Sequence, residues 1–342
     1  MVNYRYLGRS GLKITELTLG NWITGGGQSS TETAIATVHA ALDAGITSFD
    51  TADVYMNGAG EEVLGQALVG QRRESLEIFT KVYFPTGPQG ANDTGLSRKH
   101  IMESINGSLK RLQMDYVDLY QAHRYDYETP LEETMQAFAD VVRQGKAHYI
   151  GVSEWTAEQL REGHALAKEL GFQLVSNQPQ YSALYRVIEG KIVPTSKELG
   201  ISQVVFSPLA QGVLTGKYKA GQPVPAGSRA TDEKGNGKNF INWLLKDDVL
   251  NAVAELEPIA ADHGLTLAQL GLAWVLHNDN IAAALIGASR PEQVAENVKA
   301  SEVKLTDEVV ALINEKLAPV SVTDPELTYD VSPKSRIVGP HK

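Results

Sequence analysis

The chain has 342 residues, 31 basic and 41 acidic side chains, a formal net charge of −10 and no cysteine. The negative charge argues against nucleic acid as a partner, because such binding rests on clustered Lys and Arg. The lack of cysteine excludes disulfides, thiolate zinc sites, iron–sulfur clusters and cysteine nucleophiles. The amino end shows no signal-like region, and no apolar run approaches the roughly 18 residues of a membrane span. We therefore expect a cytoplasmic protein with no membrane segment.

Strand-like and helix-like segments alternate along the chain. Residues 4–7 and 13–16, around Ser10-Gly11, predict a β-hairpin at the start. Short apolar runs then predict eight strands, at 17–19, 47–49, 77–80, 117–120, 147–152, 174–177, 203–206 and 282–286. Apolar residues three and four apart predict helices between them, for instance at 33–44, 98–112, 130–143, 157–169 and 191–199. Eight strand-then-helix units favour a (β/α)8 TIM barrel over an open doubly wound sheet, with the hairpin capping the base.

Two irregular stretches interrupt this alternation. The segment from Leu209 to about Asn239 follows the seventh strand and is rich in Gly and polar residues, so we expect a loop that covers a cofactor. Residues 318–342 contain four prolines and no periodicity, which predicts an irregular tail that either wraps over the site or frays. No linker or low-complexity tract divides the chain, so we expect one domain over 1–342.

Common nucleotide and hydrolase motifs are absent. Residues 58–63, Gly-Ala-Gly-Glu-Glu-Val, lack the third glycine of a dinucleotide fingerprint and lie beyond the strand rather than at its turn. Residues 212–217 are one residue short of a phosphate-binding loop, and Tyr218 stands where that loop needs Ser or Thr. The chain has no Gly-x-Ser-x-Gly, His-Glu-x-x-His or Tyr-x-x-x-Lys pattern.

Polar groups follow three consecutive predicted strands. Asp50 and Tyr55 follow the second, Lys81 ends the third and His123 follows the fourth. Taken singly, these residues also fit a turn cap, a partly buried aromatic, a surface charge and a hydrogen-bonded core histidine. In a barrel, however, the carboxyl ends of neighbouring strands meet at one rim, where catalytic groups gather.

The combination of these four residues suits reduction of a carbonyl group. A lysine at the mouth of an apolar strand needs a partner carboxylate, and Asp50 on the adjacent strand supplies one. The ammonium would stabilise tyrosinate and lower the pKa of Tyr55 from about 10, so that the phenol can protonate a carbonyl oxygen. His123 would be a second donor to that oxygen.

In order and approximate spacing, this tetrad resembles that of the aldo-keto reductases. Residues 45–52 together with Tyr55, and 109–112 followed by 115–119, resemble the two signatures of that family. Residues 207–217 and 287–297 look most like the subgroup that contains the potassium-channel β-subunits and related bacterial reductases. The resemblance covers nearly the whole chain and implies a (β/α)8 fold that binds NADPH or NADP⁺ across the barrel mouth.

The resemblance also implies where the cofactor lies. Ser153 and Gln178 would hold the nicotinamide carboxamide, and Phe206 would stack on the ring, where the channel subunits carry tryptophan. Arg229 would meet the 2′-phosphate, on the assumption of a two-residue insertion in its loop. The full implied set is Trp22, Gln28, Asp50, Ser153, Gln178, Phe206, Ser207, Pro208, Leu209, Ala210, Gln211, Gly212, Lys217, Arg229, Gly287, Ser289, Gln293, Glu296 and Asn297.

Residues 287–292 also predict a local structure without reference to the family. Residues 287–292 predict a strand end, a hydroxyl cap at Ser289 and a proline early in a helix. A helix amino end is a natural site for a phosphate group. An ordinary serine cap without a ligand explains the same pattern equally well.

We therefore expect an NADPH-dependent reductase of aldehydes or ketones, with Tyr55 as proton donor and no metal. The substrate wall is expected to draw on Trp22, Tyr55, Tyr83, His123 and Trp155. The alternative is a regulatory, redox-sensing NADP(H)-binding subunit with slow turnover, but the channel subunits carry asparagine where this chain has His123. A third reading, a Schiff-base enzyme using Lys81, needs a neutral, unpaired lysine. The sequence leaves the physiological substrate and the oligomeric state open.

Overall fold

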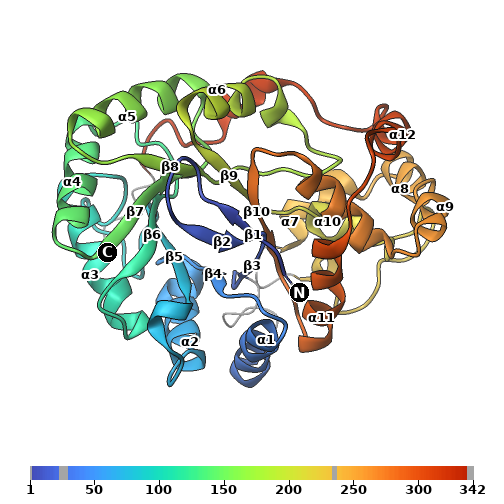
Figure 1. The fold of residues 1–342 in the computed structure, drawn as a ribbon, viewed down its shortest axis with the longest axis horizontal. Helices are drawn as coiled ribbons and strands as arrows, with labels where there is room; N and C mark the ends of the chain where they lie inside the picture. Colours follow the sequence, from blue (N-terminus) through green and yellow to red (C-terminus); the bar gives the residue numbers. More distant parts are fainter. Residues whose placement is uncertain (1, 23–29, 233–236, 337–342) are drawn as a thin grey trace.

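Eight parallel strands close into a barrel in a computed structural model that describes residues 2–22, 30–232 and 237–336 (Figure 1). Around the barrel the strands follow the order β10-β3-β4-β5-β6-β7-β8-β9. Their bounds are β3 Leu17–Gly20, β4 Ser48–Asp50, β5 Glu77–Val82, β6 Val117–Ala122, β7 Ala147–Val152, β8 Leu174–Asn177, β9 Ser202–Val205 and β10 Ile281–Ile286. The predicted (β/α)8 TIM barrel is confirmed, and each predicted strand overlaps one of these eight.

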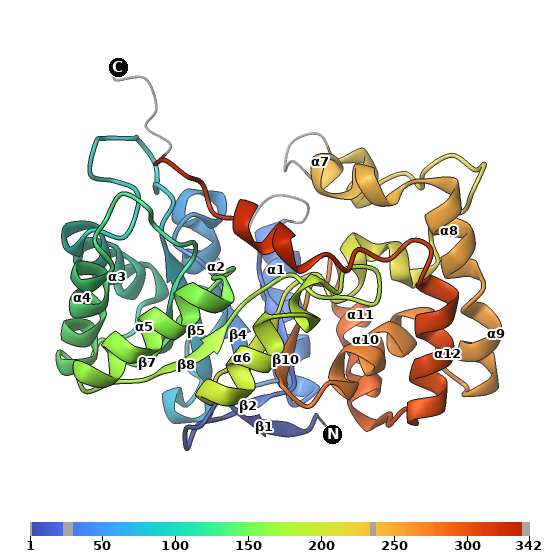
Figure 2. The ribbon, with the colours of Figure 1, turned by 90° about the horizontal axis from the view of Figure 1, so that it is seen from above.

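A β-hairpin closes the amino-terminal end of the barrel, as predicted. Strands β1 (Tyr4–Tyr6) and β2 (Lys13–Thr15) pair antiparallel, and Figure 2 shows them on the opposite side from the carboxyl tail. Leu7 and Ile14 from this hairpin are buried with Phe79 of β5 inside the barrel. Gly8 has a φ of +57°, and a Cβ there would lie 2.4 Å from a carbonyl oxygen of β8. Only glycine permits so close a contact between the hairpin turn and the barrel.

Helices surround the barrel, and those before β9 alternate with the strands. Their bounds are α1 Thr31–Asp43, α2 Ala59–Ala67, α3 Arg98–Leu112, α4 Leu131–Arg143, α5 Ala157–Glu169, α6 Ile192–Leu199, α7 Gly237–Ile241, α8 Asp247–Ala254, α9 Glu257–Asp262, α10 Leu267–His277, α11 Pro291–Asn297 and α12 Asp307–Leu317. Capping boxes fix the first turns of two of them, where Thr156 and Thr266 each exchange hydrogen bonds with the glutamine three residues on.

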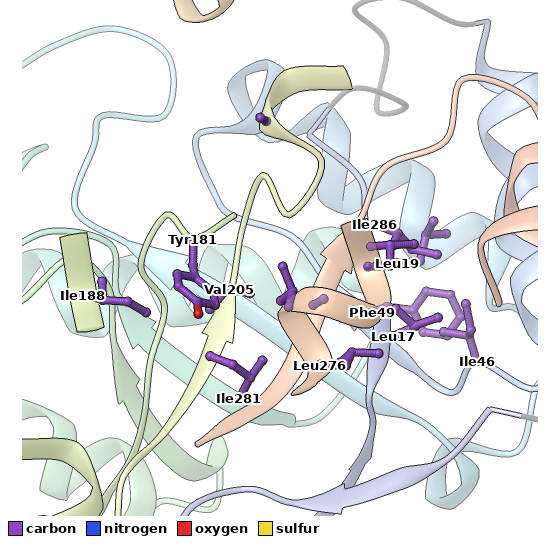
Figure 3. Packing of buried hydrophobic residues seen from close by; sticks show 14 of the residues in the cluster. Leu17, Leu19, Ile46, Phe49, Tyr181, Ile188, Val205, Leu276, Ile281 and Ile286 are labelled. Atoms are coloured by element: carbon purple, nitrogen blue, oxygen red, sulfur yellow. The ribbon is translucent and has the colours of Figure 1, made fainter. Parts of the chain in front are cut away.

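The main core lies between the strands and the surrounding helices. Figure 3 shows Leu17, Leu19 and Ile286 from β3 and β10 beside Phe49 of β4, and all four side chains are almost fully buried. Burying side chains of this size contributes about 1.5–3 kcal/mol each. The buried polar residues Asp50, Lys81 and Gln121 lie at or next to the carboxyl ends of β4, β5 and β6.

The described part of the carboxyl tail wraps over the molecule rather than fraying. After α12 it forms a bridge between Val322 and Tyr185 and a 3₁₀ turn, η8 (Pro325–Asp330). Figure 2 shows this red segment crossing to the side of α3 and α4. It ends with Arg336 in an ion pair to Asp126, with 2.9 Å between Nη2 and Oδ2. The tail is therefore attached to the loop that follows β6.

Candidate active site

Asp50 and Lys81 form a buried ion pair at the carboxyl ends of β4 and β5. The Lys81 Nζ donates to Asp50 Oδ1 at 2.6 Å and to the Thr51 carbonyl oxygen at 2.7 Å. The Lys81 side chain is fully buried and that of Asp50 is 2% exposed. Parallel pairing of β4 with β5 brings the two residues to the same rim, because Asp50 lies in register with Phe79, two residues before Lys81.

Tyr55 completes the coordination of the lysine. Its phenol oxygen lies 3.2 Å from Lys81 Nζ. An ammonium has three donors and no acceptor, so the phenol oxygen accepts this bond and its own proton points elsewhere. Tyr55 therefore has a proton available for a ligand, and all three donors of the lysine are occupied.

A strained turn holds Tyr55 in place. It opens the 3₁₀ turn η1 (Tyr55–Gly58), in which Met56 and Asn57 have φ values of 50° and 54°. Left-handed conformations of this kind cost on the order of 1–3 kcal/mol at a non-glycine residue and are found at functional sites. Gly60 leaves room beside the turn, since a Cβ there would lie 3.0 Å from Tyr55 Cβ.

The predicted pKa shift of Tyr55 has the wrong sign in this structure. Burial raises the pKa of Tyr55 above its ordinary value of 10, and the Lys81 ammonium opposes that shift only in part. The pKa of Lys81 is itself raised, because Asp50 and Tyr55 together outweigh the burial that would lower it. Tyr55 is accordingly a protonated acid and Lys81 a permanent cation at ordinary pH.

His123 adds a neutral ring to the same rim. Its ring centroid is 5.9 Å from that of Tyr55, and the planes meet at 74°. Burial, and then the charges of Arg124 and Lys81, hold the pKa of His123 well below its usual value. Its buried Nδ1 has no hydrogen-bond partner among the described residues. The imidazole can therefore offer one N–H to a ligand without carrying a charge.

Two glutamines bind the second oxygen of Asp50. Gln178 Nε2 donates to Asp50 Oδ2 at 2.8 Å, and Gln121 Nε2 lies 3.4 Å from the same atom. Ser153 Oγ donates to the Gln178 carbonyl oxygen at 2.8 Å. Ser153 and Gln178, the two residues expected at the nicotinamide carboxamide, are thus linked by hydrogen bonds to Asp50. Sequence reasoning missed Gln121, although a fully buried amide in the apolar strand β6 was a signal for it.

A second buried polar cluster lies behind Tyr55. Ser104 on α3 donates to Asp53 Oδ2 at 2.6 Å, and Asp53 Oδ1 has no partner among the described residues. Burial is the main cause that raises the pKa of Asp53 to about 8, with Ser104 opposing it. Glu61, also buried, accepts from Thr80 and from Arg111. These bonds attach the turn that carries Tyr55 to α2, α3 and β5.

The segment after β9 has a strained backbone suited to close approach of a ligand. Ser207, Ala210 and Gln211 are non-glycine residues with φ values of 55°, 48° and 59°. Gln211 Nε2 donates to Ser207 Oγ at 2.7 Å, while the buried Gln211 Oε1 has no partner among the described residues. Phe206 is partly buried over the apolar interior of the barrel. The neighbouring residues of the predicted set are Pro208, Leu209 and Gly212, the first buried and the others partly buried.

Three cations gather beside this segment. Partial burial is the main cause that lowers the pKa of Lys217. The positive charges of Arg229 and Arg290 lower it further. Burial also lowers the pKa of Arg229, to about 10. Lys217 lies against Gly212, where a Cβ would come within 3.1 Å of its Nζ. Asp232 partly offsets the charge of Arg229, and Arg290 lies 4.0 Å from Glu292. The repulsion on Lys217 nevertheless favours an anionic ligand beside it. Arg290 was not predicted.

The long loop after β9 reaches Trp22 at the end of β3. Trp22 packs edge-on against Phe240 of α7, with ring centroids 5.4 Å apart, and Arg229 lies 5.3 Å from the Trp22 ring. The loop therefore spans the rim from β9 to β3, where a covering loop was expected. Gln28 lies outside the described residues.

Helix α11 begins differently from the prediction. The residue before its first turn is Arg290, with no side-chain cap, and Ser289 Oγ instead donates to Gln293 Oε1 at 3.2 Å. The Ser289 amide donates to the same oxygen at 2.8 Å. The expected hydroxyl cap at Ser289 is wrong, because Gln293 folds back and takes both donors. The other predicted residues here are exposed Gly287, exposed Glu296 and buried Asn297.

Comparison with known proteins decides the family. The model of the Aldo/keto reductase family matches residues 16–318, which include all four members of the tetrad. The chain belongs to the aldo/keto reductase family. Members of this family are oxidoreductases that act on small carbonyl compounds and generally use NAD(P)H.

Proteins similar to this aldo/keto reductase carry channel-subunit names. A "probable voltage-gated potassium channel subunit beta" of Oryza sativa subsp. japonica is 44% identical over 96% of this chain and 99% of its own length. One of the same name in Arabidopsis thaliana is 44% identical over 88% and 92%. A "putative voltage-gated potassium channel subunit beta" of Schizosaccharomyces pombe (strain 972 / ATCC 24843) is 42% identical over 92% and 93%.

The aromatic residues expected to form a substrate wall differ in exposure. Trp22 is 37% exposed, whereas Tyr83 and Trp155 are each 1% exposed. The Trp155 ring packs against Tyr125 and against the α5 backbone, where a Cβ on Gly163 would lie 2.7 Å from it. In this conformation of the aldo/keto reductase, Trp155 is a core residue behind the wall rather than part of it.

The described residues of the aldo/keto reductase offer neither a metal site nor a single membrane-spanning helix. They contain no cluster of three His, Asp or Glu side chains that could hold a metal ion. Within 2–22, 30–232 and 237–336, no single helix is long and apolar enough to cross a membrane. One bent pair, Asp247–Asp262 with Leu267–His277, passes the same test of length and composition, and its halves meet at 89°.

Proposed function

We propose that this aldo/keto reductase reduces aldehydes or ketones to alcohols with NADPH as cofactor. The observation that carries the proposal is the contact between Lys81 Nζ and the Tyr55 phenol oxygen at 3.2 Å, with Asp50 holding the lysine at 2.6 Å. It leaves a protonated phenol with its hydrogen directed away from the lysine, as a proton donor to substrate requires.

The proposed chemistry needs little motion in the protein. The nicotinamide, when bound, supplies the hydride to the carbonyl carbon. Tyr55 transfers its proton to the carbonyl oxygen as negative charge develops there, and Lys81 stabilises the resulting tyrosinate. His123, uncharged, donates its free N–H to the same oxygen and orients it. One hydride and one proton are added, and the alcohol leaves.

The donor set fits a phosphorylated dinucleotide. Lys217, Arg229 and Arg290 would meet its phosphates, and the unpartnered Gln211 Oε1 suits an N–H donor of the ligand. Three clustered cations favour NADPH over NADH, because the 2′-phosphate adds about two negative charges. Trp22 and Phe206 offer aromatic surfaces at the two sides of the rim.

The similar proteins favour a second candidate. Their names describe subunits of voltage-gated potassium channels, and the match extends over 96% of this chain. A cofactor-sensing subunit of a channel is therefore the alternative proposal. The Schiff-base reading of Lys81 has no support, since its ammonium already donates to Asp50, Thr51 and Tyr55.

One experiment tests binding and turnover together. NADPH fluorescence is titrated with the protein, and a panel of aldehydes and ketones is then followed by cofactor absorbance. We expect tight NADPH binding, turnover of some carbonyl compounds and a loss of turnover in Tyr55→Phe with the NADPH dissociation constant nearly unchanged. Binding without turnover of any compound favours the sensing subunit, and no binding at all refutes both candidates.

A further inference from the structure

Arg124 lies next to the catalytic histidine and turns back over it. It follows His123 at the end of β6, and its Nη1 donates to the His123 carbonyl oxygen at 2.5 Å. The guanidinium carbon is 5.6 Å from the centroid of the Phe84 ring, which itself packs 5.1 Å from His123. Arg124, Phe84, His123 and Tyr55 thus form a continuous row of contacts beside the site of proton transfer.

The charge of Arg124 is not neutralised by an ion pair. Within the described residues Arg124 forms no ion pair with a carboxylate, and its one hydrogen bond there is the one to His123. By contrast, three other partly buried arginines each bind a carboxylate at 2.7–2.9 Å, namely Arg73, Arg111 and Arg336. A partly buried guanidinium has five donors, so most of those of Arg124 remain for water or a ligand.

Glu154 is the carboxylate that faces Arg124 from the next strand, but at longer range. It follows β7 in a left-handed conformation with a φ of 56°, and its Oε1 accepts from the Gln180 amide at 2.9 Å. Burial lowers the pKa of Arg124, and attraction to Glu154 opposes that shift without reaching contact. Glu154 therefore limits the excess positive charge without binding the donors of Arg124 that the His123 carbonyl leaves over.

We propose that Arg124 is a specificity residue that selects carbonyl substrates carrying a second, anionic group, either a carboxylate or a phosphate. This inference rests on the proposed reductase function, since it concerns the same site. The planar fork of a guanidinium binds both groups through two parallel hydrogen bonds. Its place beside His123 and Phe84 puts the anion a short distance from the carbonyl oxygen that Tyr55 protonates.

Matched pairs of substrates test the proposal. The value of kcat/KM is measured for 4-carboxybenzaldehyde against its neutral methyl ester, and for 4-formylphenyl phosphate against 4-methoxybenzaldehyde. We expect the parent protein to favour at least one charged member over its neutral partner by roughly 10- to 100-fold, the range of one charge-assisted contact. Comparison of the two pairs distinguishes a carboxylate from a phosphate preference.

Three variants assign the preference to one side chain. Arg124→Met should bring the charged-to-neutral ratio near one, and Arg124→Lys should keep part of it. Arg161→Met is the matched control. Arg161 is an exposed residue of α5, and it pairs with Glu198 rather than with a residue of the proposed site. Its ratio should equal that of the parent. Turnover of the neutral aldehydes shows that each variant is folded.

A binding measurement separates this inference from the proposed function. Calorimetry gives the dissociation constants of 4-(hydroxymethyl)benzoate and of its methyl ester, with NADP⁺ present. Tighter binding of the benzoate in the parent and its loss in Arg124→Met support the anion site even if no aldehyde is reduced. Equal charged-to-neutral ratios in parent and Arg124→Met for both pairs of substrates overturn the inference while leaving carbonyl reduction intact.

Discussion

The Nζ atom of Lys81 lies 2.6 Å from Asp50 Oδ1 in a place that water does not reach, since the lysine is fully buried. Removing one partner of such a pair leaves an uncompensated charge inside the protein, which costs about 3–5 kcal/mol. Lys81→Met should therefore lower the free energy of unfolding by that amount. Urea denaturation of the variant measures it.

The double variant Asp50→Asn with Lys81→Met gives the control for that prediction. It removes both charges, so its loss of stability should be smaller than that of Lys81→Met alone. A double variant at least as unstable as the single one would show that shape, and not charge, sets the cost. Both variants should lack reductase turnover.

Tyr55 should remain an acid over the ordinary pH range. Its pKa is raised above 10 by burial, and reduction needs the protonated phenol, so kcat for reduction should not fall between about pH 6 and about pH 9 on account of Tyr55. Pre-steady-state hydride transfer, followed by cofactor absorbance, measures this without interference from product release. A fall in this rate with an apparent pKa below 8 contradicts the assignment.

Asp53 should make stability fall as pH rises. Its folded-state pKa is about 8 against an ordinary value of 3.8, so between those two limits the folded protein retains a proton that the unfolded chain releases. The free energy of unfolding then decreases by about 1.4 kcal/mol per pH unit from this group, and the effect ends above pH 8. Below pH 3.8 Asp53 is protonated in both the folded and the unfolded protein, and its full stabilising contribution is present.

Comparison with Asp53→Asn isolates this contribution, since the asparagine can still accept the Ser104 hydrogen bond. Urea denaturation of parent and variant at pH 6, 7 and 8 gives the difference in stability at each pH. The free energy of unfolding of the variant should rise relative to that of the parent as pH increases. A difference independent of pH would mean that Asp53 is ionised in the folded protein.

Lys217→Ala should weaken cofactor binding more than it slows bound chemistry. The variant loses one of three clustered cations, and a charge-assisted contact contributes about 1.5–3 kcal/mol, so we expect the NADPH dissociation constant to rise by roughly 10-fold or more. The NADH dissociation constant should rise less if the lysine meets the extra phosphate. Fluorescence titration with NADPH and with NADH measures both dissociation constants. Identical constants for parent and variant would show that Lys217 does not contact the cofactor.

The sequence predicts this fold well because its strands are short apolar runs bounded by polar residues. Asp50, Lys81 and His123 were recognisable for the same reason, since each interrupts or directly follows such a run. The direction of the Tyr55 pKa shift was not predictable, because it depends on how much protein covers the phenol. The Ser289 cap failed because Gln293, four residues later, competes for the same donors. Arg290 was not predictable from its own surroundings in the sequence, because its role depends on its closeness in space to Lys217.

The Arg336 guanidinium binds Asp126, which lies three residues after His123, although Arg336 and Asp126 are 210 positions apart in the sequence. Asp126 also accepts from the Leu96 amide and from Thr129, so one carboxylate ties the tail to two active-site loops. Shortening the chain before Arg336 would thus remove the cation that pairs with the buried Asp126 carboxylate. A purification tag belongs at the amino end, beneath the hairpin and on the far side of the barrel from the reaction.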